Sequence, residues 1–521
     1  MNLPSSSPTL LFWFLFIVTC FYSCHGFYIE KSGTQGVKYI ISRYSENADR
    51  FGAKANRRKD DNEGFLNTWN KACSSEGDVA IVVPRSTYTL KPITFSGPCK
   101  SNITFQIYGT IKAPADIGDY EHRNQWIEFL NLESFRVEGG GTIDGNGKIW
   151  WRETCKIKKS QPCISSAPTA MTFRECKNFE VVNLNFINAQ QMHLRFDKCE
   201  NVRAMSLSVT APGRSPNTDG IHISATQNIS LEDCVVGTGD DCISIVSGSE
   251  YVRATNITCG PGHGISIGSL GAGHEDAKVS NVFVDGATFS GTSNGVRIKT
   301  WQGGSGFAKD ILFQNIKVHK VHNPIIIDQN YCDRKEACEE QPSAVEISNV
   351  MYRNIVGNSA SEVGVNLQCS KTIPCRGIFM ENIDLTSQKD GESAKASCHN
   401  VDLEKIGKVL ISSKHESLGS QSIILLSFFV AINYKFSILG IYHEIDQLTN
   451  SYLTKPGHLD CQSFATGLSS SSEQYCIYRN IVGTSSSEVG VTFNCSKNKE
   501  FCCITLLCSA KKPAPKPPAI M

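Results

Sequence analysis

Four short polar clusters carry the residue types that could do chemistry in this chain. They are NTDG at 217–220, GDD at 239–241, GHG at 262–264 and RIK at 297–299. Asp240 follows Asp219 by 21 residues, and His263 follows Asp241 by 22 residues. If each step were one turn of a repeating coil, these clusters would lie above one another on one face.

Together the clusters would supply three carboxylates, one imidazole and two cations. A pair of carboxyl groups, one acid and one base, hydrolyses glycosidic bonds. The acid must keep its proton, and a neighbouring carboxylate raises the pKa of a carboxyl group. Arg297 and Lys299 share a strand face and would bind an anionic group such as a sugar carboxylate.

A calcium site is an alternative use of three aspartates. The two nearby cations oppose it, and the spacing lacks the pattern of a calcium-binding loop. We therefore expect no metal and no other cofactor. Each cluster alone also has an ordinary structural explanation, because Gly, Asn and Asp are common in turns and a Lys/Arg pair is common on a solvated strand. Only a fold that stacks the clusters favours a site.

The middle of the chain predicts such a fold. From about residue 173, short apolar strands recur at intervals of roughly 20 to 38 residues, with Asn, Gly and Asp at their ends. A repeat of this length indicates an all-β, right-handed parallel β-helix. A β-sandwich is the alternative, but its turns would recur every 8 to 12 residues or so. In a β-helix, residues one coil apart lie about 4.8 Å apart.

One segment reads as a helix that covers the N-terminal end of the coil. Residues 63–75 place Phe65, Trp69 and Ala72 on one helical face. An open first coil would expose apolar interior and unpaired backbone. We therefore expect this amphipathic helix to cap the β-helix.

The two ends of the chain differ from its middle. An apolar run from Leu10 to Tyr22 predicts a secretory signal peptide over residues 1–26 and is too short for a comfortable membrane span. We assign 27–405 to a catalytic β-helix domain. In 406–521, YRNIVGTSSSEVGV nearly repeats YRNIVGNSASEVGV of 352–365 without a second copy of the four clusters. We expect this tail to have low order and no catalytic role.

Cysteine usage agrees with secretion. The chain has 22 cysteines, and the even number of 14 between Cys73 and Cys398 suits disulfides. The close pairs Cys332/Cys338 and Cys369/Cys375 could fasten loops. Sequons fit a glycosylated product and stand at Asn102, Asn228, Asn256 and Asn494. The net charge of +1 argues neither for nor against a polyanionic partner, and we expect no nucleic-acid partner.

At the four clusters the chain resembles the polygalacturonases of glycoside hydrolase family 28, and their plant branch above all. The segments SPNTDGIHI, GTGDDCISI, CGPGHGISIGSLG and NGVRIKTWQGG stand in the family's order and spacing. FSGPCKSNITFQIYGTIKAP and NPIIIDQNYCD match as well, so the likeness covers about residues 50–401. It implies a right-handed parallel β-helix that hydrolyses α-1,4-galacturonosyl bonds of de-esterified pectin with inversion and without a metal.

The resemblance also implies residue roles. Asp240 looks like the general acid, Asp219 and Asp241 look like the pair that activates water, and His263 would help set the acid's protonation. An inverting enzyme would leave about 6.5 to 9.5 Å between Asp240 and this pair, enough for a water. Further residues match the family by position. The resemblance implies that substrate is bound by Arg297, Lys299, Asn217 and Tyr331. It also implies a disulfide between Cys242 and Cys259.

We therefore expect a secreted, monomeric enzyme of the cell wall that acts on pectin and does not insert stably into membranes. Three other functions stay open. A catalytically silent wall-binding β-helix protein would bind pectin without cleaving it, although the complete cluster set argues against this. A pectate lyase would cleave by elimination, usually with Ca²⁺, whereas the acid-and-base set favours hydrolysis. A rhamnogalacturonan hydrolase ranks lower, because RIK suits a galacturonate. No motif distinguishes endo from exo cleavage.

Overall fold

A computed structural model describes residues 38–40, 61–120, 124–158, 160–332, 338–389, 391–410, 412–413, 489–495 and 502–508. The described residues do not include the predicted signal peptide or most of the predicted tail. They also do not include the side chain of Asn494, which carries the fourth sequon. The chain divides into two compact units, residues 1–417 and 418–521. The division at residue 405 stays a prediction, and strands of the coil continue past it to Leu410 and Ser413.

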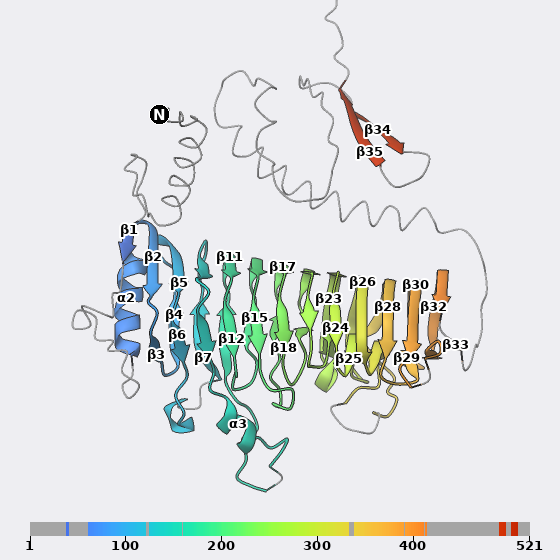
Figure 1. Ribbon diagram of the computed structural model, residues 1–521, viewed down its shortest axis with the longest axis horizontal. Coiled ribbons are helices and arrows are strands. Elements are labelled where there is room, and N and C mark those ends of the chain that lie inside the picture. Colours follow the sequence, from blue (N-terminus) through green and yellow to red (C-terminus); the bar gives the residue numbers. More distant parts are fainter. Residues whose placement is uncertain are drawn as a thin grey trace, which may run out of the picture. The chain divides into compact units, whose positions relative to one another are not determined.

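Stacked parallel strands build the first unit (Figure 1). One sheet has twelve strands: β4 (Ile93–Ser96), β7 (Gln125–Leu130), β10 (Thr169–Arg174), β13 (Leu194–Asp197), β16 (Ile221–Ser224), β19 (Ile243–Ile245), β22 (Ile265–Leu270), β25 (Asn294–Thr300), β27 (Asn323–Asp328), β29 (Val363–Gln368), β31 (Lys395–His399) and β33 (Ser412–Ser413). We call this sheet the site sheet.

The remaining strands of this unit form a second sheet of 21 strands, which we call the back sheet. Its members are β1 (Lys38–Ile40), β2 (Gly77–Val83), β3 (Thr87–Thr89), β5 (Ser101–Ile107), β6 (Thr110–Lys112), β8 (Arg136–Glu138), β9 (Thr142–Asp144), β11 (Lys177–Val182), β12 (Asn185–Ile187), β14 (Glu200–Met205), β15 (Ser208–Thr210), β17 (Gln227–Glu232), β18 (Val235–Gly237), β20 (Glu250–Thr255), β21 (Thr258–Cys259), β23 (Asp276–Asp285), β24 (Thr288–Ser290), β26 (Ser305–Val321), β28 (Glu346–Ser359), β30 (Cys375–Ser387) and β32 (Val401–Leu410).

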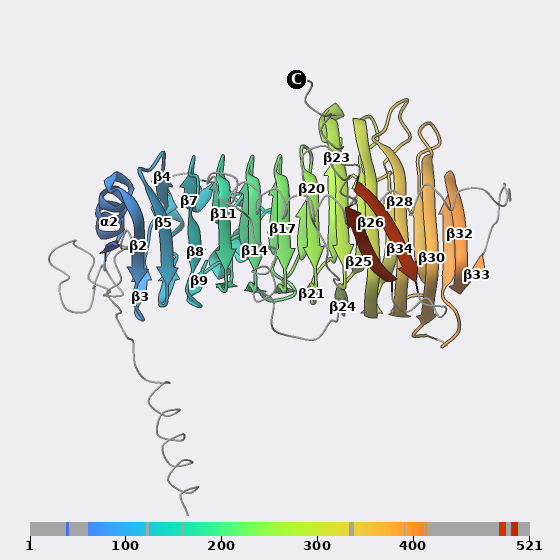
Figure 2. The same ribbon diagram turned by 90° about the horizontal axis from the view of Figure 1, so that it is seen from above.

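Each coil contributes strands to both sheets, so the predicted right-handed parallel β-helix is confirmed (Figure 2). Inward side chains stack coil upon coil, as Phe129, Phe173 and Phe196 show. Their ring centroids lie 5.0 and 5.5 Å apart in successive coils. This aromatic stack is buried in one continuous core. Since alternate strand residues point outward, the same registers align the polar residues on the outer faces.

The predicted capping helix is also confirmed. Helix α2 spans Asn62–Ser74 and buries Phe65, Trp69 and Ala72. Trp69 packs on Phe95 at 5.0 Å between ring centroids, and its Nε1 donates to the Ser96 carbonyl at 3.1 Å. The helix therefore covers the apolar end of the first coils, where it stands in Figure 1.

The loops between the strands contain two short 3-10 helical turns, Ile117–Tyr120 and Ala272–His274. They also contain one further α-helix, α3 (Lys148–Glu153). Five disulfides tie the described loops: Cys73–Cys99, Cys155–Cys163, Cys242–Cys259, Cys332–Cys338 and Cys369–Cys375. In the second unit, β34 (Val489–Cys495) and β35 (Cys502–Cys508) pair antiparallel. Among the residues that the structure describes, no helix is long and apolar enough to cross a membrane.

Candidate active site

The turns that enter the site sheet carry the polar clusters. NTDG lies before β16, GDD before β19 and GHG before β22, and RIK lies within β25. These four strands are consecutive neighbours, with Ile221, Ile243, Ile265 and Val296 in register. The parallel register therefore brings together the residues that the spacing predicted.

Glycines let the turns pack this closely. A Cβ on Gly239 would lie 1.9 Å from the Ser215 carbonyl oxygen. Gly264 has a φ of +88°, and a Cβ there would lie 2.2 Å from the Asn294 carbonyl oxygen. Only glycine meets both demands without strain, so these two positions fix the turns around the aspartates.

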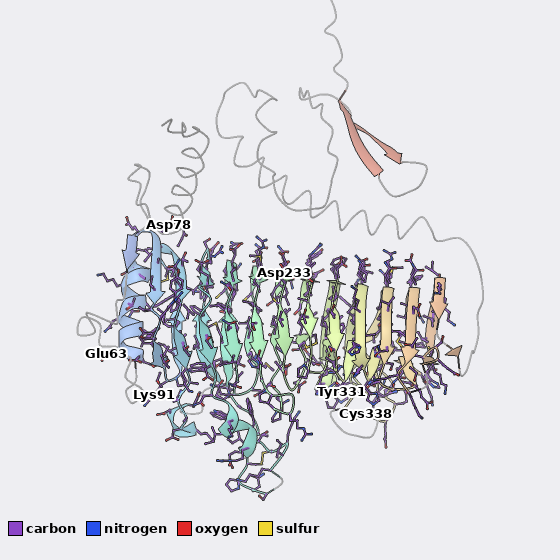
Figure 3. The ribbon with its side chains drawn as sticks, in the orientation of Figure 1. Glu63, Asp78, Lys91, Asp233, Tyr331 and Cys338 are labelled. Atoms are coloured by element: carbon purple, nitrogen blue, oxygen red, sulfur yellow. A yellow bond between two sulfur atoms is a disulfide. The ribbon has the colours of Figure 1, made fainter. Side chains whose placement is uncertain are left out.

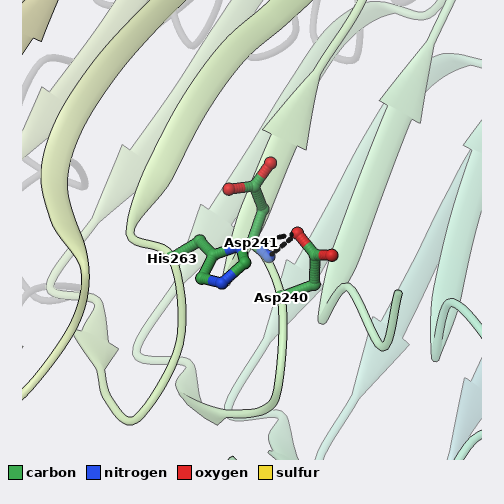
Figure 4. Close-up of side chains that lie close together, drawn as sticks. All are labelled: Asp240, Asp241 and His263. Carbon is green, nitrogen blue, oxygen red and sulfur yellow. Dashed lines mark hydrogen bonds and ion pairs between the residues drawn. The ribbon is translucent and has the colours of Figure 1, made fainter. Parts of the chain in front are cut away.

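Asp240 and His263 form a hydrogen-bonded pair (Figure 4). His263 Nδ1 lies 3.0 Å from Asp240 Oδ1, which also accepts the Asp241 backbone N–H at 2.9 Å. Burial alone would raise the pKa of Asp240. The hydrogen bond and charge of His263 outweigh burial and, with the Lys299 charge, lower this pKa to about 2. The prediction that like-charge repulsion keeps Asp240 protonated is therefore wrong for this geometry, because the imidazole stabilises the carboxylate.

Asp219 has the opposite environment. It is buried, and burial raises its pKa, reinforced by the charges of Asp240 and Asp241. Ser244 Oγ donates to Asp219 Oδ2 at 2.8 Å, and His222 Nδ1 lies 2.7 Å from the same Ser244 Oγ. In the ligand-free site the pKa of Asp219 is thus raised and that of Asp240 is lowered, the reverse of the expected directions.

Asp241 is held by cations. Arg297 Nη2 donates to its Oδ1 at 2.6 Å and Lys299 Nζ to its Oδ2 at 2.9 Å. Ser266 Oγ donates to Oδ1 at 2.8 Å and accepts Arg297 Nε at 2.9 Å. Arg297 and Lys299, predicted to bind substrate, therefore also fix a neighbouring carboxylate.

The described contacts reveal further residues that the sequence interpretation missed. Ser244 and Ser266 are in register on β19 and β22, and each donates to one aspartate. A signal was present, since both serines stand between isoleucines, 22 residues apart. His222 lies one coil before Ser244, in register with it, and its ring Nδ1 bonds to the Ser244 hydroxyl.

His193 is a second omission. It is fully buried, its Nδ1 donates to the Asp219 carbonyl at 2.9 Å, and its Nε2 accepts the Ala189 N–H at 3.3 Å. Burial lowers its pKa to about 4. The neutral ring thus fastens the turn that carries Asp219 to the preceding coil.

The two less specific substrate-binding predictions fall on opposite sides of the aspartates. Tyr331 is labelled in Figure 3. Lys299 Nζ lies over its ring, 5.4 Å from the ring centroid, in a cation–π contact. The ring of Trp301 packs edge-on against Tyr331, with 5.9 Å between the ring centroids. Asn217, in a left-handed conformation with φ of 55°, lines a hollow beside α3. Tyr331 therefore lies on the side of the cations, and Asn217 on the side of the earlier coils.

The carboxyl groups lie closer than expected. Asp240 and Asp241 each offer an oxygen, and His263 a nitrogen, within 4.8 Å of one another. This is shorter than the gap of about 6.5 to 9.5 Å that inverting glycosidases keep between acid and base. By this distance between single oxygens, Asp240 and Asp241 lie closer than the expected spacing. Asp219 is the remaining base candidate on a different coil.

The same three residues could in principle hold a divalent cation. However, both Asp241 oxygens bond to the cations Arg297 and Lys299. A metal would have to displace these bonds and lie beside two positive charges. The donor set therefore does not fit a metal.

The Cys242–Cys259 disulfide is buried at both ends. It joins the residue directly after GDD to the end of β21, three residues before GHG begins. The three sequons in the described part of the chain, Asn102, Asn228 and Asn256, are exposed on or beside strands of the back sheet. Glycosylation at them stays a prediction.

Comparison with known proteins decides the family. Residues 73–410 match the profile of glycosyl hydrolases family 28. The chain belongs to this family. It is 59% identical over 367 residues to "Polygalacturonase QRT2" of Arabidopsis thaliana, covering 70% of this chain and 83% of the relative. It is 54% identical over 374 residues to "Polygalacturonase-2" of Solanum lycopersicum, covering 72% and 80%.

Solved structures of other proteins share the fold. An endo-xylogalacturonan hydrolase from Aspergillus tubingensis superposes with a TM-score of 0.60 at 24% identity, covering 69% of this chain and 98% of that one. A polygalacturonase from Erwinia carotovora ssp. carotovora gives 0.57 at 20% identity, covering 73% and 99%. At these identities the likeness supports the β-helix and nothing finer.

Proposed function

We propose that this chain is a secreted hydrolase of the α-1,4-galacturonosyl bonds of de-esterified pectin. Its membership of glycosyl hydrolases family 28 makes it a glycoside hydrolase, and the most similar relatives named above are polygalacturonases of plants. The observation that carries the proposal is the stacked set of Asp240, Asp219 and Asp241 beside Arg297 and Lys299.

The cations would receive the carboxylate of a galacturonosyl unit. Arg297 and Lys299 are almost buried, with side-chain exposures of 14% and 10%. A charge-assisted bond in such a site is stronger than one in water. The incoming carboxylate would share these donors with Asp241 and would partly release it, so that Asp241 becomes available as a base.

The acid step would use the Asp240–His263 pair as a unit. In the free protein, despite burial, the hydrogen bond and charge of His263 lower the pKa of Asp240. Bound substrate would exclude water and so strengthen the effect of burial, which raises this pKa, and its negative charge beside Lys299 would weaken one of the effects that lower it. Asp240 would then take up a proton and pass it to the glycosidic oxygen as the bond to the anomeric carbon breaks. Asp219 or Asp241 takes a proton from the water that attacks this carbon.

Five disulfides in the described residues suit an oxidising compartment and support the proposed secretion. Reducing-sugar release from polygalacturonate tests the function. We expect wild type to be active and Asp240→Asn to lose about 10²- to 10⁴-fold, the usual contribution of a general acid. Equal rates would refute the assignment. Pectin binding without cleavage would favour the silent wall-binding protein, and unsaturated products would favour a lyase.

A further inference from the structure

His222 is joined to Asp219 through a single serine hydroxyl. It lies on β16 in register with Ser244 on β19, and its Nδ1 lies 2.7 Å from Ser244 Oγ. Ser244 Oγ donates in turn to Asp219 Oδ2 at 2.8 Å, whereas His222 Nδ1 itself is 3.9 Å from that oxygen. The side chains of His222 and Asp219 are each 12% exposed. The imidazole therefore reaches the carboxyl group through Ser244, and largely out of contact with solvent.

The hydrogens of this chain have one arrangement when Asp219 is ionised. A carboxylate can only accept hydrogen bonds, and a hydroxyl group has one hydrogen to donate. The Ser244 hydrogen therefore points to Asp219, and Ser244 Oγ accepts a hydrogen from His222 Nδ1. Two donors in line thus end on the carboxylate, and each polarises the next. Hydrogen bonds to the charged form of a carboxyl group favour that form.

Asp219 needs this support because its surroundings disfavour its charge. Burial raises its pKa, and the charges of Asp240 and Asp241 add to the rise. The hydrogen bonding and charge of His222 lower the pKa and so oppose both effects. A base must be ionised before it can take a proton from water. His222 therefore acts on the property that Asp219 would need as a base.

One charged residue, Arg195, faces His222 from the preceding strand of the site sheet. Arg195 lies in register with His222 on β13, and its Nη2 donates to Asp197 Oδ1 at 3.2 Å. The same Asp197 oxygen accepts Ser224 Oγ at 2.6 Å. On the following strand the residue in register with His222 is the uncharged Ser244. The guanidinium and the carboxylate of β13 are thus paired with each other, and Asp219 is the acid that His222 supports.

Asp241 is held by the same kind of serine but by a different basic residue. Ser266 Oγ donates to Asp241 Oδ1 at 2.8 Å and accepts Arg297 Nε at 2.9 Å. Arg297 keeps its charge at every working pH, and Lys299 Nζ donates to the other oxygen of Asp241 at 2.9 Å. Among the described residues, no Lys or Arg nitrogen lies within ion-pair distance of Asp219. A water at Asp219 therefore need not compete with a cation.

We propose that His222 is a positioning residue that orients Asp219 through Ser244 and holds it ionised, so that Asp219 takes the proton of the attacking water. In this step the water oxygen bonds to the anomeric carbon while its proton passes to the Asp219 carboxylate. The inference rests on the proposed polygalacturonate hydrolysis and selects Asp219 from the two candidate bases of that reaction.

Two substitutions separate the hydrogen bond from the bulk of the side chain. His222→Asn places an amide nitrogen close to the position of Nδ1 and keeps a donor for Ser244, whereas His222→Leu keeps the volume and loses the donor. On polygalacturonate, His222→Leu should lower kcat about tenfold at unchanged KM, the usual worth of one hydrogen bond. The acid limb of its profile of kcat against pH should move to higher pH, since the pKa of Asp219 rises without this support. His222→Asn should recover most of the lost kcat.

A double-mutant cycle tests the route through the serine. If His222 acts through Ser244, His222→Leu should change kcat little when Ser244→Ala is already present. His319→Asn, at an exposed position on β26, is the matched control and should follow wild type. Urea midpoints establish that each variant is folded.

A rise of KM with an unmoved acid limb would place His222 in direct contact with substrate and overturn the positioning role. A loss by His222→Leu that persists in full beside Ser244→Ala would overturn the route through Ser244. If His222→Leu does not fold, His222→Asn decides: kcat and an acid limb close to those of wild type are expected, and a loss as large as that of Ser244→Ala would overturn the proposal. An inactive wild type would instead refute the proposed function.

Discussion

The buried histidine that bonds to the turn of Asp219 predicts a specific loss of stability in acid. His193 has a pKa of about 4 in the folded protein, against about 6.5 in an unfolded chain. The unfolded state therefore binds the proton first, and stability falls as pH drops from about 6.5 to 4. Linkage gives a loss of about 2 kcal/mol at pH 5 and about 3 kcal/mol at pH 4 for this group alone.

The physical cause is the fixed tautomer. Because Nε2 accepts the Ala189 N–H, a proton on that nitrogen would break the bond and leave a charge in the core. His193→Gln keeps one donor and one acceptor but cannot gain a charge. Its free energy of unfolding should fall by about 3 kcal/mol less than that of wild type between pH 7 and pH 4.

Urea unfolding, followed by tryptophan fluorescence at several pH values, measures the difference. His319→Gln, at an exposed position on β26, is the matched control and should follow wild type. The aspartates titrate alike in all three proteins, so they cancel in the comparison. Parallel pH profiles for wild type and His193→Gln would refute the reasoning.

Three further predictions concern the contacts around the aspartates. Replacing both Cys242 and Cys259 by Ser should lower the free energy of unfolding by about 3 kcal/mol, judged by the urea midpoint, and an unchanged midpoint would contradict a stabilising role. Ser244→Ala removes a hydrogen-bond donor to Asp219, so the pKa of this carboxyl should rise. The acid limb of the profile of kcat against pH should then move to higher pH. If the limb stays where it is, Asp219 is not the titrating base. Lys299→Met should lower kcat/KM on polygalacturonate by about 10- to 100-fold, the worth of a charge-assisted bond, and an unchanged value would remove Lys299 from the binding site.

The sequence predicted the scaffold well, because a β-helix repeats its registers. Spacings of 21 and 22 residues placed Asp219, Asp240, Asp241 and His263 on adjacent turns, as the structure shows. The capping helix was visible from its apolar face. Local periodicity sufficed in both cases, since each coil contacts mainly its neighbours.

The electrostatics could not be predicted in the same way. The lowered pKa of Asp240 depends on how closely His263 approaches, and the raised pKa of Asp219 depends on its burial. His193 gave no such signal, because one sequence does not reveal which buried polar group bonds to the turn that carries Asp219.

The anomeric form of the first product tests the proposed mechanism most directly. Proton NMR of fresh digests of polygalacturonate distinguishes the two reducing-end anomers before they equilibrate. The account predicts that the β-anomer appears first from the α-linked substrate, because water activated by Asp219 or Asp241 attacks opposite the leaving group. Initial release of the α-anomer would contradict it. Such a result would fit the short distance between Asp240 and Asp241 and would indicate a covalent intermediate.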